Sequence, residues 1–485
     1  MSSKKINSDI VKGSAWSLLS RIIQVLIKSG AVILLARYLG PSEFGLMMLV
    51  ISISTIATAF IDIGISPATA RLLAEEKGYN KKELIRKSVY LLFFTSILVL
   101  SICILGFPWL SSLLSAEALA EVNILVTLLI FGLILQKYLM KVFEGSRQIT
   151  SFGKIYSIAG WLPWFLSFGF VLSFGESVYW AVGGYVAGYY ILDFLLARKF
   201  KQFYDNQEDK GRSVGYKKIL RYAVPMIATT ASLYIYTQSD ILLIQYFLGE
   251  SAVGTYSAAI KLIEASMVGA MAIGNGSASY FPLVRNKGIK AFKNLIVNTT
   301  KTIKILYLPI IGAILLSSTE IIDLLYGVEY SSAYIILLIY MPYILFRSLS
   351  CVYSPALDYL GLADQRAIAV GISAILNVIL NLFLIPLWGI EGAAIATQLT
   401  YSPLIIGYLV YMFKSVEITA IDYFAIYKIV FLVWLGSLSM GLVGNFYLNI
   451  NSIIVAIIFG VIFLLANISL KEIKLKSLTA LTKSE

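Results

Sequence analysis

The sequence contains no histidine and only two cysteines, Cys103 and Cys351. The lack of histidine removes the commonest metal ligand and the side chain that titrates nearest to neutral pH. Both cysteines stand inside apolar segments, so they offer neither a disulfide framework nor a C-x-x-C metal site. Charged residues make up only 14% of the chain, against about 25% in a typical soluble domain. These absences argue against a disulfide-rich protein, a zinc enzyme and a soluble domain.

The sequence is rich in long hydrophobic runs. Hydrophobic residues make up 59% of the 485 residues, and the mean hydropathy is +0.82. A helix crosses the hydrocarbon core of a membrane with about 20 apolar residues. On this measure we expect an all-α polytopic membrane protein with about 14 transmembrane helices. The predicted spans are residues 15–37, 44–66, 88–107, 122–142, 152–174, 178–197, 219–247, 253–275, 299–317, 331–352, 366–386, 391–412, 424–444 and 452–470.

The basic residues predict the orientation of these spans. With both termini on the cytoplasmic side, nearly all of the 39 Lys and Arg residues fall on inner loops or tails, and Arg37 is the exception on the outer side. Cytoplasmic loops collect Lys and Arg in this way. The net charge of +12 therefore indicates membrane topology, and we expect no nucleic-acid partner. The N-terminus lacks a small-residue cleavage site, so the first helix is expected to be retained.

A short motif occurs twice in the chain. LLARYLGPSEFG (34–45) aligns without a gap with LIQYFLGESAVG (243–254) at an offset of 209 (254 minus 45), and five of the twelve positions are identical. Such parallel repeats are related by an axis along the membrane normal and enclose a cleft at midplane. We therefore predict two six-helix bundles related by pseudo-twofold symmetry. The predicted parts are a bundle at 1–197, a cytoplasmic linker at 198–218, a bundle at 219–412, and two additional helices with a cytoplasmic tail at 413–485.

Charged residues inside the spans need a reason, because each costs roughly 2.5–3.5 kcal/mol at the bilayer centre. In the first span, Arg21, Gln24 and Lys28 are spaced so that they share one helix face. We interpret them as one wall of the cleft, binding an anionic headgroup. Arg21 could instead extend to the inner interface. Lys261 and Glu264 are adjacent on another span, where they either face the cleft or neutralise each other.

Carboxylates also occur within the predicted spans. Asp62 either serves the cleft or caps a helix end, and Asp240 is deeper in its span, in the stretch YTQSDILL. Asp193 stands close to the inner end of its span, where solvation is the expected explanation. Among the many aromatic residues, Tyr234, Tyr236 and Trp161 could stack on a sugar or an isoprenoid.

Several stretches resemble one known family. WSLLSRIIQVLIKSGAVILLARYLGPSEFGLMMLV, DIGISPATARLLAEE, SDILLIQYFLGESAVGTYSAAIKL and LLYGVEYSS are similar to the polysaccharide flippases of the multidrug/oligosaccharidyl-lipid/polysaccharide exporter superfamily. The resemblance covers nearly the whole chain. It implies twelve or fourteen helices and a secondary transporter that moves a polyprenyl-phosphate-linked oligosaccharide from the inner to the outer leaflet of the cell membrane.

The resemblance also implies roles for the charged residues. Arg21, Gln24, Lys28 and Lys261 would bind the pyrophosphate of the substrate by replacing its water. An ion gradient would supply the energy, with Na+ or H+ as the coupling ion and Asp62, Asp240 and Glu264 as candidate coupling carboxylates. No other cofactor, catalytic residue or metal site is expected. The bilayer, the lipid-linked substrate and other glycan-assembly proteins are the expected partners of a monomer.

Two alternatives remain open at this point. One is an ion-coupled multidrug or small-molecule exporter of the same fold, although an exporter of cationic drugs would favour a net acidic cleft. The other is a membrane-embedded glycosyltransferase or polymerase. The sequence lacks a nucleotide-binding P-loop, and its predicted outer loops are too short to hold a folded domain, so an enzyme is disfavoured.

Overall fold

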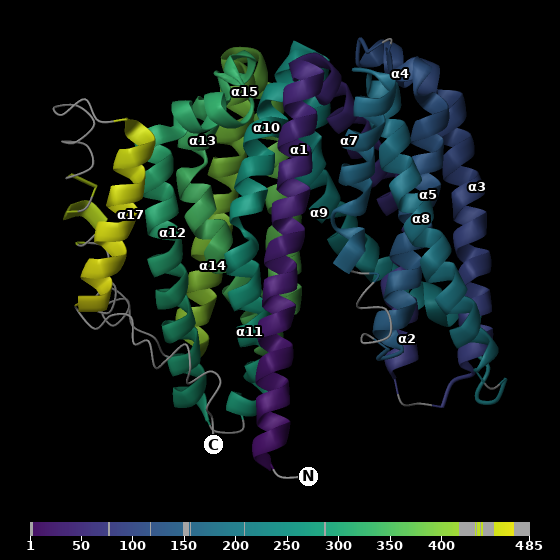
Figure 1. The fold of residues 1–485 in the computed structure, drawn as a ribbon. Coiled ribbons are helices and arrows are strands. Elements are labelled where there is room, and N and C mark those ends of the chain that lie inside the picture. Colours follow the sequence, from purple (N-terminus) through teal and green to yellow (C-terminus); the bar gives the residue numbers. More distant parts are fainter. Residues whose placement is uncertain are drawn as a thin grey trace. The chain divides into compact units, whose positions relative to one another are not determined.

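The fold is known from a computed structural model, which is almost entirely helical (Figure 1). The described residues are 3–75, 78–116, 118–148, 155, 157–207, 209–285, 288–416, 432, 434–436, 438–439 and 451–469. Within helices, the side chains of 3–22, 102–103, 110, 225, 227–231, 279, 282–285 and 413 lie outside this description. The predicted all-α fold is confirmed.

The first two predicted spans both lie in α1 (Ser3–Asp62). A kink at Gly40 divides this element into two helices. Gly40 has φ 71° and ψ 173°, and Pro41 follows it. A positive φ is accessible to glycine without strain, and proline is suited to the first position of a helix. The Gly-Pro pair therefore ends one span and starts the next. A short helix, α2 (Ile65–Ala74), continues the second span.

The remaining elements follow the predicted spans closely. They are α3 (Lys81–Leu113), α4 (Ala118–Glu121), α5 (Asn123–Gly145), α7 (Leu162–Phe174), α8 (Val178–Asp205), α9 (Tyr216–Leu248), α10 (Glu250–Ser266), α11 (Val268–Arg285), α12 (Ile289–Leu325), η1 (Val328–Tyr330), α13 (Ala333–Ile339), α14 (Met341–Tyr359), α15 (Ala363–Val416) and α17 (Ser452–Ser469). Helix α15 contains two predicted spans, joined at a break at Trp388 and Gly389. The predicted span 424–444 lies largely outside the described residues.

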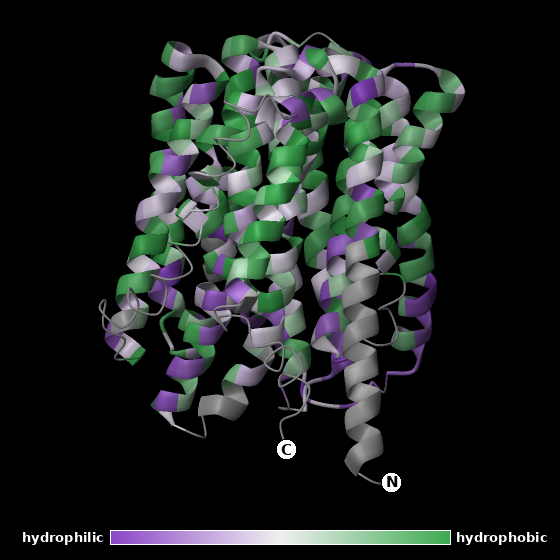
Figure 2. Ribbon diagram, turned by 60° about the vertical axis from the view of Figure 1, so that its left-hand side comes forward, coloured by the Kyte–Doolittle hydropathy of each residue, from purple (hydrophilic) through white to green (hydrophobic). Residues whose placement is uncertain are grey.

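The helices have the length and composition of membrane spans. Among the described residues, six helices are long and apolar enough to cross a membrane by themselves. Two bent pairs also pass when each pair is taken as one span: α10 with α11, bent by 41°, and α13 with α14, bent by 54°. Hydrophobic residues cover most of the length of the helices (Figure 2). The chain is therefore a multi-pass membrane protein.

The contacts divide the chain into two compact units. The first unit comprises Ile23–Ala258 with Val370–Ala393, and the second comprises Met1–Ile22, Ala259–Ala369 and Ala394–Glu485. In the first unit α7 packs on α8, and α2 packs on both α5 and α9. In the second unit α12 packs on α17 and α14, and α11 packs on α14. The predicted bundles at 1–197 and 219–412 stay a prediction.

The two copies of the repeated motif contact each other within the first unit. A Cβ on Gly45 would stand 1.9 Å from the carbonyl oxygen of Glu250, and a Cβ on Gly254 would stand 1.9 Å from the carbonyl oxygen of Pro41. The offset of 209 that aligns the motifs also relates Pro41 to Glu250 (250 minus 41). The contact is therefore reciprocal, as at a twofold interface. The side chain of Ser42 adds a hydrogen bond to the Glu250 carboxylate at 3.1 Å.

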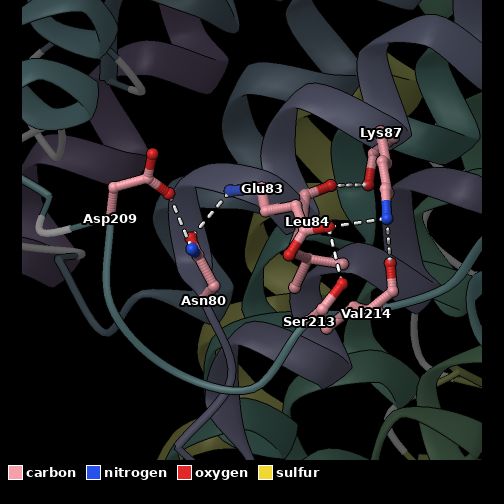
Figure 3. Close-up of polar contacts among 8 residues, drawn as sticks. Asn80, Glu83, Leu84, Lys87, Asp209, Ser213 and Val214 are labelled. Atoms are coloured by element: carbon pink, nitrogen blue, oxygen red, sulfur yellow. Dashed lines mark hydrogen bonds and ion pairs between the residues drawn. The ribbon is translucent and has the colours of Figure 1, made fainter.

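The segment between α8 and α9 is docked on the start of α3 in the first unit (Figure 3). Residues 78–80 form a short parallel bridge with Arg212: the Arg212 amide donates to the Gly78 carbonyl at 2.8 Å, and the Asn80 amide donates to the Arg212 carbonyl at 3.0 Å. The Asn80 side chain accepts from the Glu83 amide at 2.9 Å and donates to Asp209 at 2.6 Å. Asn80 thereby caps α3 and holds the segment.

Side chains one turn into α3 hold the same segment. Lys87 donates to the Glu83 carboxylate at 2.6 Å and to the Val214 carbonyl at 2.9 Å, while Ser213 donates to Glu83 at 2.7 Å (Figure 3). Helix α8 runs to Asp205 and α9 begins at Tyr216, so the predicted linker 198–218 contains the end of one helix and the start of the next. The residues between them are held by hydrogen bonds along the described part of the segment.

The reciprocal glycine contact predicts that Gly45→Ala and Gly254→Ala each destabilise the protein. An added methyl would overlap a backbone oxygen that cannot move alone, and overpacking of this kind costs about 1–3 kcal/mol. Thermal unfolding of detergent-purified protein, followed by size-exclusion chromatography, measures the loss. Gly407→Ala is the matched control, because a Cβ there meets nothing within 4 Å. Equal stability of all three variants would contradict the close contact.

Candidate functional site

The predicted substrate-binding face of the first span lies on α1. Lys28 is half-buried, and its ammonium stands 5.9 Å from the ring centroid of Trp164, a buried residue of α7. Gln24 is also half-buried, with its side-chain oxygen 3.8 Å from the Cβ position of Gly160. Arg21 is part of α1, but its side chain lies outside the described residues. A lysine over a tryptophan face is attracted by the ring quadrupole.

Lys261 and Glu264 pair with each other on α10, in the second unit. Their charged atoms are 3.0 Å apart, and the Glu264 side chain is 49% exposed while that of Lys261 is 21% exposed. This is the self-neutralising arrangement that the spacing of three residues allows. The roles predicted for Lys261 in substrate binding and Glu264 in ion coupling stay predictions.

Asp62 lies at the end of α1 and is completely buried. One carboxylate oxygen accepts from the amide and the hydroxyl of Ser66, at 2.9 and 2.5 Å, which caps the start of α2. The other oxygen is 2.9 Å from the ammonium of Lys137 on α5. Lys137 in turn stands 5.1 Å from the ring centroid of Tyr234 on α9. Asp62 therefore combines a capping role with a buried ion pair that links α1 and α5.

Lys137 was not among the site residues predicted from the sequence. The signal was available, because Lys137 stands inside the predicted span 122–142 and a charge there needs a partner. Its partner could not be identified by helical spacing, because Asp62 belongs to a different helix.

Asp240 on α9 is the centre of a buried polar cluster in the first unit. Its side chain is 6% exposed. One carboxylate oxygen accepts from the Tyr256 hydroxyl at 2.8 Å, and the other accepts from the Asn381 amide at 2.6 Å. Asn381 also donates to the side-chain oxygen of Asn377 at 3.1 Å, and Ser239 donates to the same oxygen at 3.4 Å. Helices α9, α10 and α15 thus meet around one carboxylate.

The cluster gathers oxygen atoms that could serve a small cation. The side-chain oxygen of Asn381 is buried and has no hydrogen-bond partner among the described residues. Carboxylate and amide oxygens are the ligands that hard cations prefer. Within the described residues no group of three or more His, Cys, Asp or Glu side chains could hold a metal ion. Asn377 and Asn381 were missed from the sequence, although two asparagines one turn apart in the apolar span 366–386 are a recognisable signal.

Asp193 on α8 is buried, whereas the sequence predicted that water would solvate it. The residue is 3% exposed, and neither carboxylate oxygen has a hydrogen-bond partner among the described residues. Oδ2 lies 3.5 Å from the Cβ position of Gly132 on α5. The prediction was wrong because helix packing against α5, and not distance from the helix end, decides whether water reaches this side chain.

The chain matches the family described as polysaccharide biosynthesis protein over residues 10–286. It is 28% identical over 190 residues to the probable low-salt glycan biosynthesis flippase Agl15 of Haloferax volcanii, and the match covers 38% of this chain and 40% of that protein. It is 27% identical over 385 residues to the uncharacterized membrane protein MJ1375 of Methanocaldococcus jannaschii, covering 75% of this chain and 88% of that protein. The chain thus matches less than half the length of Agl15.

Two solved structures have a similar fold. The lipid II flippase MurJ in an inward closed conformation has a TM-score of 0.75 at 17% identity, and the similarity covers 94% of this chain and 98% of that one. A multidrug resistance MATE family transporter in an inward-facing conformation has a TM-score of 0.62 at 14% identity, covering 82% and 98%. These similarities concern the fold. Because the family match extends over more than half of the 485 residues, the chain belongs to the polysaccharide biosynthesis protein family, which confirms the resemblance found in its sequence.

Proposed function

We propose that this protein is a secondary transporter that moves a polyprenyl-phosphate-linked oligosaccharide from the inner to the outer leaflet of the cell membrane. Membership of the polysaccharide biosynthesis protein family is the observation that carries the proposal. A fold shared with a lipid II flippase supports it. A charged headgroup cannot cross about 30 Å of hydrocarbon unaided. The protein must therefore offer polar groups within its spanning helices.

The proposed headgroup contacts begin with Lys28. Its ammonium lies against the Trp164 ring, and a lysine so placed provides charge-assisted donors to phosphate oxygens. Gln24, one turn away on α1, adds a neutral donor. Arg21 and Lys261 are further proposed contacts of an anionic headgroup, and transport would follow the alternating-access scheme expected for paired repeats. Both termini are proposed to be cytoplasmic, and the protein is proposed to act as a monomer.

Asp240 is the proposed coupling residue. Asp62 is neutralised by Lys137, and Glu264 by Lys261. Asp240 is buried and accepts from a tyrosine hydroxyl and an asparagine amide, and the side-chain oxygen of that asparagine, Asn381, is buried beside it without a hydrogen-bond partner among the described residues. A buried carboxylate with an amide oxygen next to it offers the oxygen ligands that a hard cation prefers. Na+ or H+ would then bind at Asp240 and link transport to the ion gradient.

Transport can be tested with purified protein in liposomes that carry a fluorescent lipid-linked oligosaccharide in one leaflet. We expect protein-dependent movement of the sugar to the other leaflet, measured by its accessibility to an added glycosidase. Failure to move the sugar, together with extrusion of a cationic dye, would favour the multidrug exporter. New glycosidic bonds in the same liposomes would favour an enzyme.

Lys28→Ala is expected to slow oligosaccharide movement about ten-fold or more, because a charge-assisted hydrogen bond to the headgroup is lost. Membrane insertion should be unaffected, since the helix becomes more apolar. The glycosidase-accessibility assay gives the rate. Lys141→Ala serves as the control, because Lys141 pairs with Glu144 at 2.7 Å on an exposed helix face. An unchanged rate in Lys28→Ala would remove this residue from the binding site.

Asp240→Asn is expected to abolish the acceleration of transport by an imposed ion gradient, because the amide keeps the side-chain shape but carries no negative charge to attract a cation and does not take up a proton. Transport rates under separate Na+ and pH gradients identify the coupling ion in the wild type. Asp358→Asn provides a matched control, since Asp358 pairs with Arg366 at 2.6 Å. A gradient dependence equal to that of the wild type would assign Asp240 to packing.

A further inference from the structure

Arg347 is a charge within a membrane span that the sequence interpretation did not consider. It lies on α14, which forms one bent span with α13. The residue is 14 positions after Ala333 and 12 before Tyr359 (347 minus 333 and 359 minus 347). At about 1.5 Å per residue it is therefore roughly 20 Å of helix from either end. A guanidinium inside a membrane-spanning helix is costly unless it has a specific role.

The contacts of Arg347 come from neutral aromatic side chains. Its guanidinium donates to the Tyr401 hydroxyl on α15 at 3.2 Å, and lies 6.0 Å from the centroid of the same ring. Tyr401 is buried, and its hydroxyl donates to Ser350 at 2.9 Å. The Tyr343 ring stands 4.7 Å from the Tyr401 ring. These contacts orient the guanidinium and use only part of its five-donor fork.

Arg347 differs in its partners from two other cations of the spans, which are paired with carboxylates. Lys137 pairs with Asp62, and Lys261 pairs with Glu264. Within the part of the chain that the structure describes, no carboxylate lies within ion-pair distance of Arg347. Its positive charge is therefore not neutralised by the described side chains.

The surface of α14 around Arg347 is polar. Tyr343, Arg347, Ser350, Ser354 and Asp358 are spaced by four, three, four and four residues, so they lie on one face of the helix. On this face Arg347 and Asp358 are exposed, Tyr343 and Ser354 are half-buried, and Ser350 is buried under Tyr401.

The opposite face of α14 is apolar and packs inside the second unit, with Leu349, Val352 and Ala356 buried. A helix facing lipid would show the reverse arrangement, with its apolar side chains open. This arrangement favours water over hydrocarbon as the surroundings of the exposed Arg347 side chain.

We propose that Arg347, oriented by Tyr401, binds an oxyanion of the transported lipid-linked oligosaccharide. The inference rests on the proposed function. An arginine fork binds phosphate or carboxylate oxygens bidentately, so the oxyanion is either the pyrophosphate of the carrier lipid or the carboxylate of an acidic sugar. The half-buried ring of Tyr343, which packs against the buried Tyr401 ring, provides an aromatic surface for a sugar ring on the same helix face.

Binding to purified protein tests this proposal without requiring transport. The probes are a polyprenyl pyrophosphate, the uncharged polyprenol, and two lipid-linked oligosaccharides that differ only in a neutral or a uronic acid sugar. We expect Arg347→Gln to weaken binding of an anionic probe about ten-fold or more and to leave polyprenol binding unchanged. Equal loss with all charged probes identifies the pyrophosphate, and loss confined to the uronate probe identifies the sugar carboxylate.

Three further variants separate binding from packing. Arg347→Lys keeps the charge but loses the fork, so we expect intermediate affinity. Tyr401→Phe leaves the guanidinium unoriented, so we expect a few-fold loss that again spares polyprenol, and this variant serves if Arg347→Gln does not fold. Arg366→Gln is the control, because Arg366 pairs with Asp358, and we expect wild-type affinity.

The outcomes distinguish this inference from the proposed function. Wild-type affinity of Arg347→Gln or Tyr401→Phe for every anionic probe, with reduced thermal stability, would overturn the inference and make Arg347 a packing residue. Specific binding of anionic probes by a wild-type protein that moves no oligosaccharide would overturn the proposed function and leave the oxyanion site standing.

Discussion

Every charge within a membrane-spanning helix of this protein has to find its partner inside the chain or face water. Hydrocarbon offers no hydrogen bonds and screens charge poorly, so an isolated charge there is unfavourable. The described side chains meet this constraint in different ways. Asp62 is paired with Lys137, and Asp240 is surrounded by hydroxyl and amide donors. Arg347 is held by tyrosine and lies on an open polar face.

These differences separate charges held in ion pairs from charges that lie against aromatic rings. The ion pair of Asp62 with Lys137 is closed, and the Ser66 cap uses the other carboxylate oxygen. Such a pair links helices but offers little to a ligand. Lys28 lies against an aromatic ring, and Arg347 is held by Tyr401. Aromatic rings fix the position of a cation without cancelling its charge, which suits the binding of an anion.

The close contact between Gly45 and Gly254 gives the internal repeat a structural meaning. Each glycine lies under the backbone of the other copy, at positions related by the offset that aligns the sequences. Only residues without a side chain allow helices to approach so closely. The positive φ angles of Gly40 and Gly249, 71° and 85°, place a turn at the same position within each motif. The repeat therefore preserves a backbone contact as well as a hydrophobic pattern.

The sequence by itself determined the solvent, the helical class, the approximate spans and the family, because apolar run length and short motifs are local properties of the chain. It also indicated which charges needed an explanation. Only the tertiary structure decided how they are satisfied: Asp62 meets Lys137 on α5, Asp240 meets Asn381 on α15, and Asp193 is buried against α5. Helical periodicity predicts which residues share a face of one helix, whereas these partners come from different helices. The packing that brings them together depends on the whole fold.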